Sequence, residues 1–147
     1  MGLKWRIIRA PLCIIWWWLY RYVRNVYGIE LSRKVKVGRR LWLAHQSGMV
    51  IGAAEIGDDC LIRHNVTIGA TSNATIDRAP VLKNRVEVGA GAVILGGIVI
   101  GDDVRIGPNA VVTTDVPAGA AVMAPLARIV PVKKHSQAPD PIKRNEI

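Results

Sequence analysis

Two histidines occupy the same local position within aliphatic segments. His45 comes two residues after Leu43, and His64 comes two residues after Ile62. Imidazole is the side chain best suited to accept a proton near neutral pH, so either histidine is a candidate general base. An ordinary solvated surface histidine is the alternative for each. The third histidine, His135, lies in a polar C-terminal segment, and we expect it to be inert.

The elements that would position these histidines follow a period of six residues. An aliphatic side chain recurs at every sixth position, and glycine often follows it. The runs are Ile56, Ile62 and Ile68, and then Leu82, Val88, Ile94, Ile100, Ile106 and Val112. Neither an α-helix nor an alternating strand has this period. A short strand plus a turn does, and three such units close a triangular coil with the aliphatics inside. A β-sandwich with coincidental spacing is the alternative.

Residues 37–112 provide about four such coils, stacked at the strand spacing of about 4.8 Å. Gly and the Asp-Asp or Pro-Asn pairs would turn the corners. Ile68 and Leu82 are 14 residues apart instead of 12. We expect the excess to form a polar loop over residues 70–80 that is ejected from the coils.

A second interruption lies beside the first histidine. Leu43 and Ile56 are 13 residues apart, which is one residue more than two units. His45 and His64 are 19 residues apart, which is one coil of 18 plus that extra residue. We therefore expect both histidines to project from one face, on adjacent coils.

Charge and cysteine content narrow the class of protein. Residues 1–40 carry ten Lys and Arg and one acid, whereas residues 41–112 carry five basic and seven acidic residues. The basicity therefore belongs to the N-terminal segment. Cys13 and Cys60 cannot form a disulfide framework, and no Cys/His cluster indicates zinc. These features fit a reducing cytosol and predict no metal site.

The repeat resembles the hexapeptide-repeat acetyltransferases, which form left-handed parallel β-helices. The resemblance covers residues 28–131. Within the family it is most similar to the serine O-acetyltransferase-like branch, and there to bacterial exopolysaccharide O-acetyltransferases. The residues that carry it are LAHQSGMVIG (43–52), IGDDCLIRHNVTIGA (56–70), VGAGAVILGGIVIGDDVRIGPNAVVTTDVP (88–117) and ARIV (127–130).

The resemblance implies an acetyl-CoA-dependent enzyme that works as a homotrimer. The acceptor hydroxyl attacks acetyl-CoA directly, and His45 matches the family's general base. Possible substrate-contacting or orienting residues are His64, Glu30, Arg78 and Asn84. Candidate contacts to the cofactor are Gly69, Ala70, Ala92, Ala110, Arg128 and Lys133. The glycine and alanines could equally be corner or core residues, and the two cations could belong to a solvated tail.

Three departures from the serine acetyltransferase pattern bear on the acceptor. Ala44 stands where the family has Asp before the histidine, and Ala79 replaces a second histidine in a loop that keeps Asp77 and Arg78. Glu30 stands in place of an earlier Asp. We therefore expect a sugar hydroxyl of a polysaccharide or lipid-linked saccharide as acceptor. A small acceptor such as serine is the alternative within enzymes, and a non-catalytic β-helical membrane scaffold is the alternative outside them.

The chain ends are expected to differ from the repeat. Residues 1–27 form a basic, Trp-rich arm with a helix from about residue 12 to 26, and residues 132–147 form a flexible tail. The charge-free apolar run, residues 10–20, is shorter than the roughly 20 residues that span a bilayer. Tryptophans among arginines indicate attachment to an anionic membrane surface through residues 4–27, which would place the protein at the inner face of the cell membrane. Packing of the helix against the trimer is the alternative. No nucleic-acid-binding motif is present.

Overall fold

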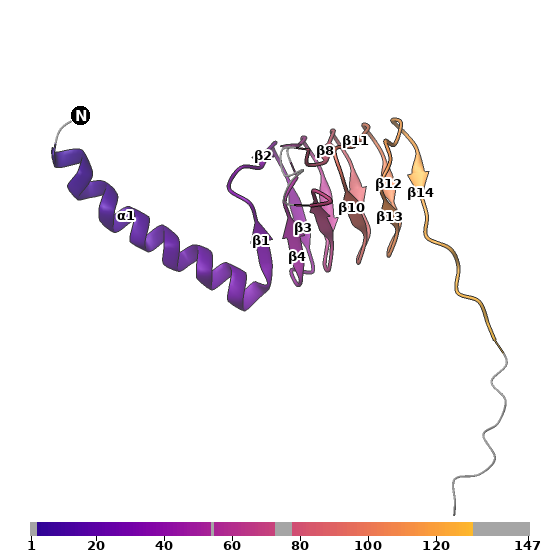
Figure 1. The fold of residues 1–147 in the computed structure, drawn as a ribbon, viewed down its shortest axis with the longest axis horizontal. Helices are drawn as coiled ribbons and strands as arrows, with labels where there is room; N and C mark the ends of the chain where they lie inside the picture. Colours follow the sequence, from indigo (N-terminus) through magenta and orange to yellow (C-terminus); the bar gives the residue numbers. More distant parts are fainter. Residues whose placement is uncertain (1–2, 54, 73–77, 131–147) are drawn as a thin grey trace, which may run out of the picture.

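The computed structural model describes residues 3–53, 55–72 and 78–130. An N-terminal helical arm leads into a solenoid of short parallel strands, and the chain leaves the solenoid at its far end (Figure 1). The arm consists of helix α1 (Leu3–Tyr22) and one π-helical turn (Val23–Tyr27), which ends at Gly28 in the left-handed conformation.

The strands form three parallel sheets in which every third strand is a neighbour. The first sheet contains β1 (Ile29–Leu31), β4 (Met49–Ile51), β7 (Thr67–Gly69), β10 (Val93–Leu95) and β13 (Val111–Val112). The second contains β2 (Lys36–Val37), β5 (Glu55–Ile56), β8 (Val81–Leu82) and β11 (Val99–Ile100). The third contains β3 (Trp42–Ala44), β6 (Leu61–Arg63), β9 (Glu87–Val88), β12 (Arg105–Ile106) and β14 (Ala121–Val122).

This order gives a three-sided solenoid in which each turn of the chain visits the three sheets once. Four turns contribute a strand to every sheet. The last turn, from β13 to β14, pairs with the second sheet through a single bridge between Val116 and Ile100. The predicted all-β solenoid of hexapeptide repeats is therefore confirmed.

The core is a set of aliphatic ladders that run along the solenoid axis. Ile62 pairs with Val88, and Val88 with Ile106, and all three side chains are buried. The residue before each of them faces outward, so these strands present one side chain to the core and the next to the surface. The six-residue period thus arises because each side of the triangle contributes one such aliphatic per coil.

The corners between the second and third sheets are held by side chains that bond to the next coil. The Asp58 backbone N–H donates to Oδ1 of Asn84 at 2.9 Å, and the Asn84 N–H donates to Oδ1 of Asp102 at 2.8 Å. Asp59 and Asp103, which follow in the same corners, adopt positive φ. The Gly-Asp-Asp segments therefore turn the corners as predicted.

Ion pairs stack along the outside of these corners. Arg85 donates two hydrogen bonds to Asp103, at 2.7 and 2.8 Å, and Arg40 pairs with Asp59 in the same way. Hydrogen bonds from these guanidinium groups lower the pKa of both carboxyls. For Asp58 the backbone N–H of Arg39 is the largest cause of a lowered pKa. The arginines are exposed and the carboxyls are exposed or half-buried, so the contribution of these pairs to stability is small.

The corner between the third and first sheets contains the irregularity that the sequence indicated. Ile68 lies six residues after Ile62, whereas Ile51 lies eight residues after Leu43, although the two pairs are stacked in register. The first corner therefore holds two extra residues. The following corner is one residue short, since Ile56 lies five residues after Ile51. The single extra residue counted in the sequence is the net of these two changes.

The helix differs from the prediction at its N-terminal end. It begins at Leu3 instead of near residue 12, and it continues through Pro11. A proline inside a helix removes one hydrogen bond but does not have to end the helix. Within the described residues, no helix is long and apolar enough to cross a membrane.

Two sequence expectations fall partly or wholly outside the described residues. Of the ejected loop 70–80, residues 70–72 and 78–80 are described and carry no strand. The C-terminal tail 132–147 lies outside the described residues.

The ladders predict unequal effects of the same substitution at two valines. Val88→Ala removes two methyl groups from a fully buried site, so we expect a loss of about 2 kcal/mol in the free energy of unfolding. Val111 is 67% exposed, and Val111→Ala should change it by less than about 0.5 kcal/mol. Urea unfolding followed by circular dichroism measures both. Equal losses would contradict the ladder.

Close stacking at the corners predicts a second contrast, between two glycines. A Cβ on Gly57 would lie 2.7 Å from the backbone carbonyl atoms of Lys83 in the next coil, whereas a Cβ on Gly69 meets no atom within 4 Å. Gly57→Ala should therefore lower the free energy of unfolding by about 2 kcal/mol or more. Gly69→Ala should change it by less than about 0.5 kcal/mol. Thermal unfolding of the two variants is the measurement, and a harmless Gly57→Ala would show that the coils do not stack this closely.

Candidate active site

His45 and His64 lie against each other on adjacent coils. Their ring centroids are 5.9 Å apart and their planes meet at 88°, so the rings pack edge to face. His45 is exposed, whereas His64 is half-buried. The structure therefore brings together the two histidines that the sequence pattern singled out.

The two-residue insertion at this corner determines how His45 is presented. Ala44 pairs with Arg63, which places His45 beside His64 in the strand register. The backbone N–H of Asn65 donates to the carbonyl of Ser47 at 2.7 Å, so Ser47 takes the regular corner position below His64. His45 and Gln46 are thus the two residues in excess, and we call them, together, the corner bulge.

The backbone of His45 has the conformation that such a bulge requires. Its φ is +57°, in the left-handed region, where His, Asn and Asp are more common than other non-glycine residues. Met49, three residues beyond the bulge, is fully buried, so the chain returns at once to the core ladder. The bulge therefore carries its imidazole outward without disturbing the stack.

The second imidazole is held partly inside the surface. Nδ1 of His64 is buried, and it has no hydrogen-bond partner within the part of the chain that the structure describes. The backbone of His64 is fixed, because its carbonyl accepts a hydrogen bond from the Gly91 N–H at 3.0 Å. A buried ring nitrogen without a partner is uncommon in folded proteins and calls for an explanation, of which a catalytic role is one. The pair thus offers one exposed imidazole for proton transfer and a second one behind it.

Glu30 lies on the outer face of the sheet next to this corner. It is exposed in β1 and pairs with Val50 of β4, the strand that follows the corner bulge. A carboxylate is therefore available on the strand adjacent to the histidine corner.

Arg78 lies at a different corner of the same chain. Its Cβ is 3.0 Å from the position that a Cβ on Gly97 would take, in the turn that follows β10. The histidines lie in the turns that precede the strands of this first sheet. Within one chain, Arg78 and His45 are therefore at opposite edges of the sheet.

Asn84 has a structural role in the corner, and its contact with substrate stays a prediction. Its Oδ1 accepts the hydrogen bond from Asp58 described above, at a corner between the second and third sheets. The histidines lie at the corner between the third and first sheets. The side chain therefore stabilises the stack, away from the candidate site.

The residues predicted to contact the cofactor lie in different parts of the chain. Ala92 and Ala110 belong to the buried ladder, so their methyl groups point into the core and cannot touch a molecule on the surface. Gly69 and Ala70 lie at the end of β7, where open space surrounds the Cβ position of Gly69. Arg128 is exposed in the segment after β14. The prediction for Lys133 falls outside the described residues.

The sequence did not reveal the size of the corner bulge. Its only signal was the 13-residue interval, in which an insertion of two was masked by the deletion of one in the next corner. In the described part of the chain, no three His, Cys, Asp or Glu side chains lie together in a way that could hold a metal ion.

Comparison with known proteins agrees with the fold. Residues 79–114 match the family described as bacterial transferase hexapeptide (six repeats). A serine acetyltransferase of Helicobacter pylori (strain J99) is 48% identical over 113 residues, which cover 76% of this chain and 66% of that protein. A serine acetyltransferase of Synechococcus elongatus is 41% identical over 125 residues, which cover 80% of this chain and 51% of that protein.

A solved structure extends the likeness to three dimensions. The soybean serine acetyltransferase apoenzyme superposes with a TM-score of 0.68 at 34% identity, covering 87% of this chain and 52% of that one. The chain thus spans about two thirds of the Helicobacter protein and about half of the other two.

The comparisons correct the expected acceptor. These relatives are serine acetyltransferases, so the prediction of a polysaccharide or lipid-linked sugar as acceptor, and of an exopolysaccharide branch, was wrong. The substitutions at Ala44 and Ala79 were given too much weight, because relatives of up to 48% identity carry the serine acetyltransferase name. Glu30 also keeps a carboxylate where the pattern has Asp, and Arg78 is retained. The repeat, its coils and these relatives together show that the chain belongs to the hexapeptide-repeat acetyltransferases.

Proposed function

We propose that the protein transfers an acetyl group from acetyl-CoA to the hydroxyl of serine or a closely similar small hydroxy amino acid. The observation that carries the proposal is the exposed imidazole of His45, which the corner bulge holds against His64. The names of relatives with up to 48% identity support serine as the acceptor.

The proposed reaction is a direct transfer. His45 accepts the proton of the serine hydroxyl while the oxygen attacks the carbonyl carbon of the thioester. The resulting tetrahedral oxyanion is stabilised by nearby backbone N–H groups. It collapses with loss of the CoA thiolate, which takes the proton back from the imidazolium. The products are O-acetylserine and CoA with a free thiol, and no enzyme nucleophile is needed.

The acceptor's own charges require two more groups. Serine carries an ammonium and a carboxylate, which favour a carboxylate and a guanidinium as partners. Glu30 lies one strand away from the corner bulge, where its carboxylate can pair with the ammonium of serine. The guanidinium of Arg78 is suited to bind the carboxylate of serine. Within one chain, however, Arg78 lies at the opposite edge of the sheet.

A homotrimer would resolve this separation. His45 is an exposed side chain at an outer corner of the solenoid, where a neighbouring copy could enclose a substrate. In a cyclic trimer each contact joins two different patches, one from each neighbour. We propose that three solenoids lie side by side, so that the Arg78 edge of one copy faces the histidine corner of the next. CoA would then lie along this seam, near Gly69 and Ala70.

The direct test is release of free thiol from acetyl-CoA with L-serine as acceptor. His45→Ala should lower kcat by about 10²–10⁴-fold because it removes the general base. Gln46→Ala is the matched control, since it alters the other residue of the corner bulge and should keep most of the activity. Thermal unfolding should be similar for both variants.

Three results would count against this proposal in different ways. Thiol release that is unchanged in His45→Ala would exclude His45 as the base. Release that does not respond to serine but occurs with another small hydroxy acid would exclude serine as acceptor. No release together with no binding of CoA in calorimetry would exclude the transferase function and favour a non-catalytic role.

A further inference from the structure

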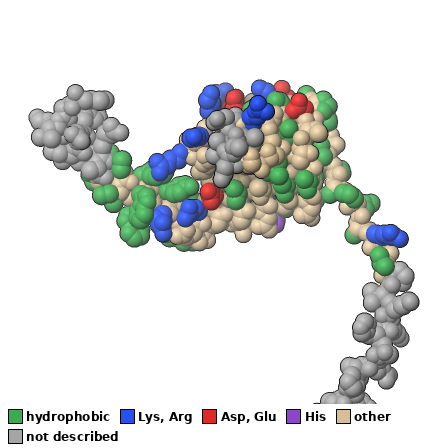
Figure 2. All heavy atoms as spheres, in the orientation of Figure 1, with side chains coloured by type: hydrophobic (Ala, Val, Ile, Leu, Met, Phe, Trp, Pro, Cys, Tyr) green, Lys and Arg blue, Asp and Glu red, His purple; other side chains and the backbone are tan. Residues whose placement is uncertain are grey.

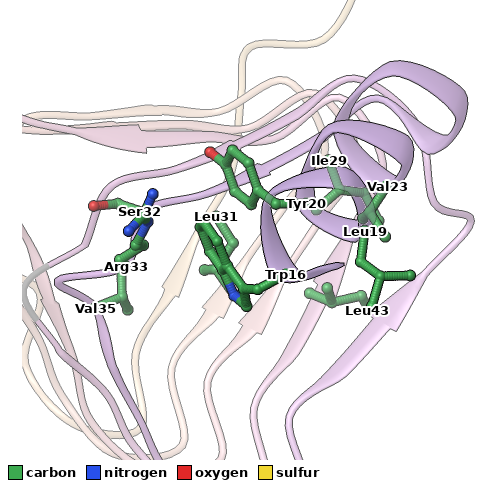
Figure 3. A pocket seen from close by; sticks show the side chains of 10 residues that line it. All are labelled: Trp16, Leu19, Tyr20, Val23, Ile29, Leu31, Ser32, Arg33, Val35 and Leu43. Atoms are coloured by element: carbon green, nitrogen blue, oxygen red, sulfur yellow. The ribbon is translucent and has the colours of Figure 1, made fainter. Parts of the chain in front are cut away.

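Helix α1 approaches the solenoid only with its C-terminal end, and its N-terminal end projects away from the coils (Figure 1). Trp16, Leu19 and Val23 line a groove of about 500 Å³ against Leu31 and Leu43 of the first coil (Figure 3). The guanidinium carbon of Arg33 lies 3.8 Å from the centroid of the Trp16 ring, which is a close cation–π contact. This near face therefore points toward the first coil, and Trp16 is in contact with it through Arg33.

The opposite face of the helix carries large apolar side chains, and the groove beside them is lined by residues of the arm alone. Trp17, Trp18, Arg21, Tyr22 and Val26 line a second groove of about 340 Å³ on this side. The rings of Trp17 and Trp18 meet edge to face at 5.4 Å, and 64% of Trp18 is exposed. We call this surface the far face. Exposed apolar surface of this kind marks an interaction site.

The charge on and near the far face indicates which kind of surface can bind there. The guanidinium of Arg21 lies 4.9 Å from the centroid of Trp17, and Arg24 follows one turn later. Residues 1–40 contain ten Lys and Arg, and the single acid, Glu30, lies in the solenoid. Figure 2 shows hydrophobic and basic side chains together over the arm and the first coils. The complementary surface must therefore be both apolar and anionic.

A second copy of this chain does not meet that requirement. Two far faces packed on each other would bring Arg21 and Arg24 of both copies together, and the helix from residue 3 to 22 has no acidic side chain to offset them. A bilayer with anionic lipids does meet it. Indole and phenol rings settle at the headgroup level, where arginines contact phosphate.

We propose that the far face of α1 docks on the surface of an anionic lipid membrane. The helix lies in the plane of the interface, with Trp17 and Trp18 inserted among the headgroups and Arg21 and Arg24 on lipid phosphates. The solenoid, held to the near face by Trp16 and Arg33, stays on the aqueous side. The proposal does not depend on the acetyl transfer reaction.

Co-sedimentation of the full chain with vesicles tests the proposal. One set of vesicles is pure phosphatidylcholine, and the other contains roughly one third phosphatidylglycerol. We expect binding to the second set only, and we expect Trp17→Ala/Trp18→Ala to weaken it at least about tenfold. Trp42→Ala is the matched control, because Trp42 is 70% exposed but lies on β3 of the solenoid, and it should bind as the wild type does.

A second variant separates charge from apolar contact. Arg21→Gln/Arg24→Gln should also weaken binding to the anionic vesicles, and high salt should do the same to the wild type. Failure of the wild type to bind, equal binding to neutral vesicles, or binding that survives Trp17→Ala/Trp18→Ala would overturn the proposal. Loss of an oligomer in that variant, without vesicle binding by the wild type, would instead assign the far face to contacts between copies.

Discussion

Stacking of coils through backbone hydrogen bonds and interior aliphatic ladders is the constraint on which the rest of the structure depends. No single coil can bury its aliphatic residues, because each is covered only by the coils above and below it. Val88, between Ile62 and Ile106, shows the arrangement, and Gly57 below Lys83 shows how little space the corners leave. Any feature of the surface must therefore return the chain to the ladder within a few residues.

The corner bulge is a departure that the ladder tolerates. His45 and Gln46 leave the stack, while Ala44 before them and Ser47 after them keep their partners in the next coil. The chain thus presents the imidazole of His45, which can accept and release a proton, on a rigid stack of coils. A histidine at a regular corner would instead lie half-buried, as His64 does. The arm is joined to the same solenoid only at its C-terminal end, where Trp16 contacts Arg33, and its far face is left for a partner.

The parts of the fold that repeat could be predicted from the sequence, and the parts that break the repeat could not. The six-residue spacing predicted the ladders and the corners at Asp59 and Asp103, because one residue type per position is enough to define them. The spacing did not show that the interval between Leu43 and Ile56 combines an insertion of two residues with a deletion of one. The sequence also left open the side-chain direction at Ala92 and Ala110, because a small residue fits the core and the surface equally well. The acceptor could not be inferred from Ala44 and Ala79, since a few substitutions do not define a binding site.

One variant tests most directly whether the corner bulge makes the site. Deletion of Gln46 and Ser47 keeps His45 and leaves a corner of regular length, with Gly48 in the position of Asn65. The account predicts a folded protein with a thermal unfolding temperature near that of the wild type and with thiol release from acetyl-CoA reduced to the level of His45→Ala. A folded deletion variant with activity close to the wild type would contradict it.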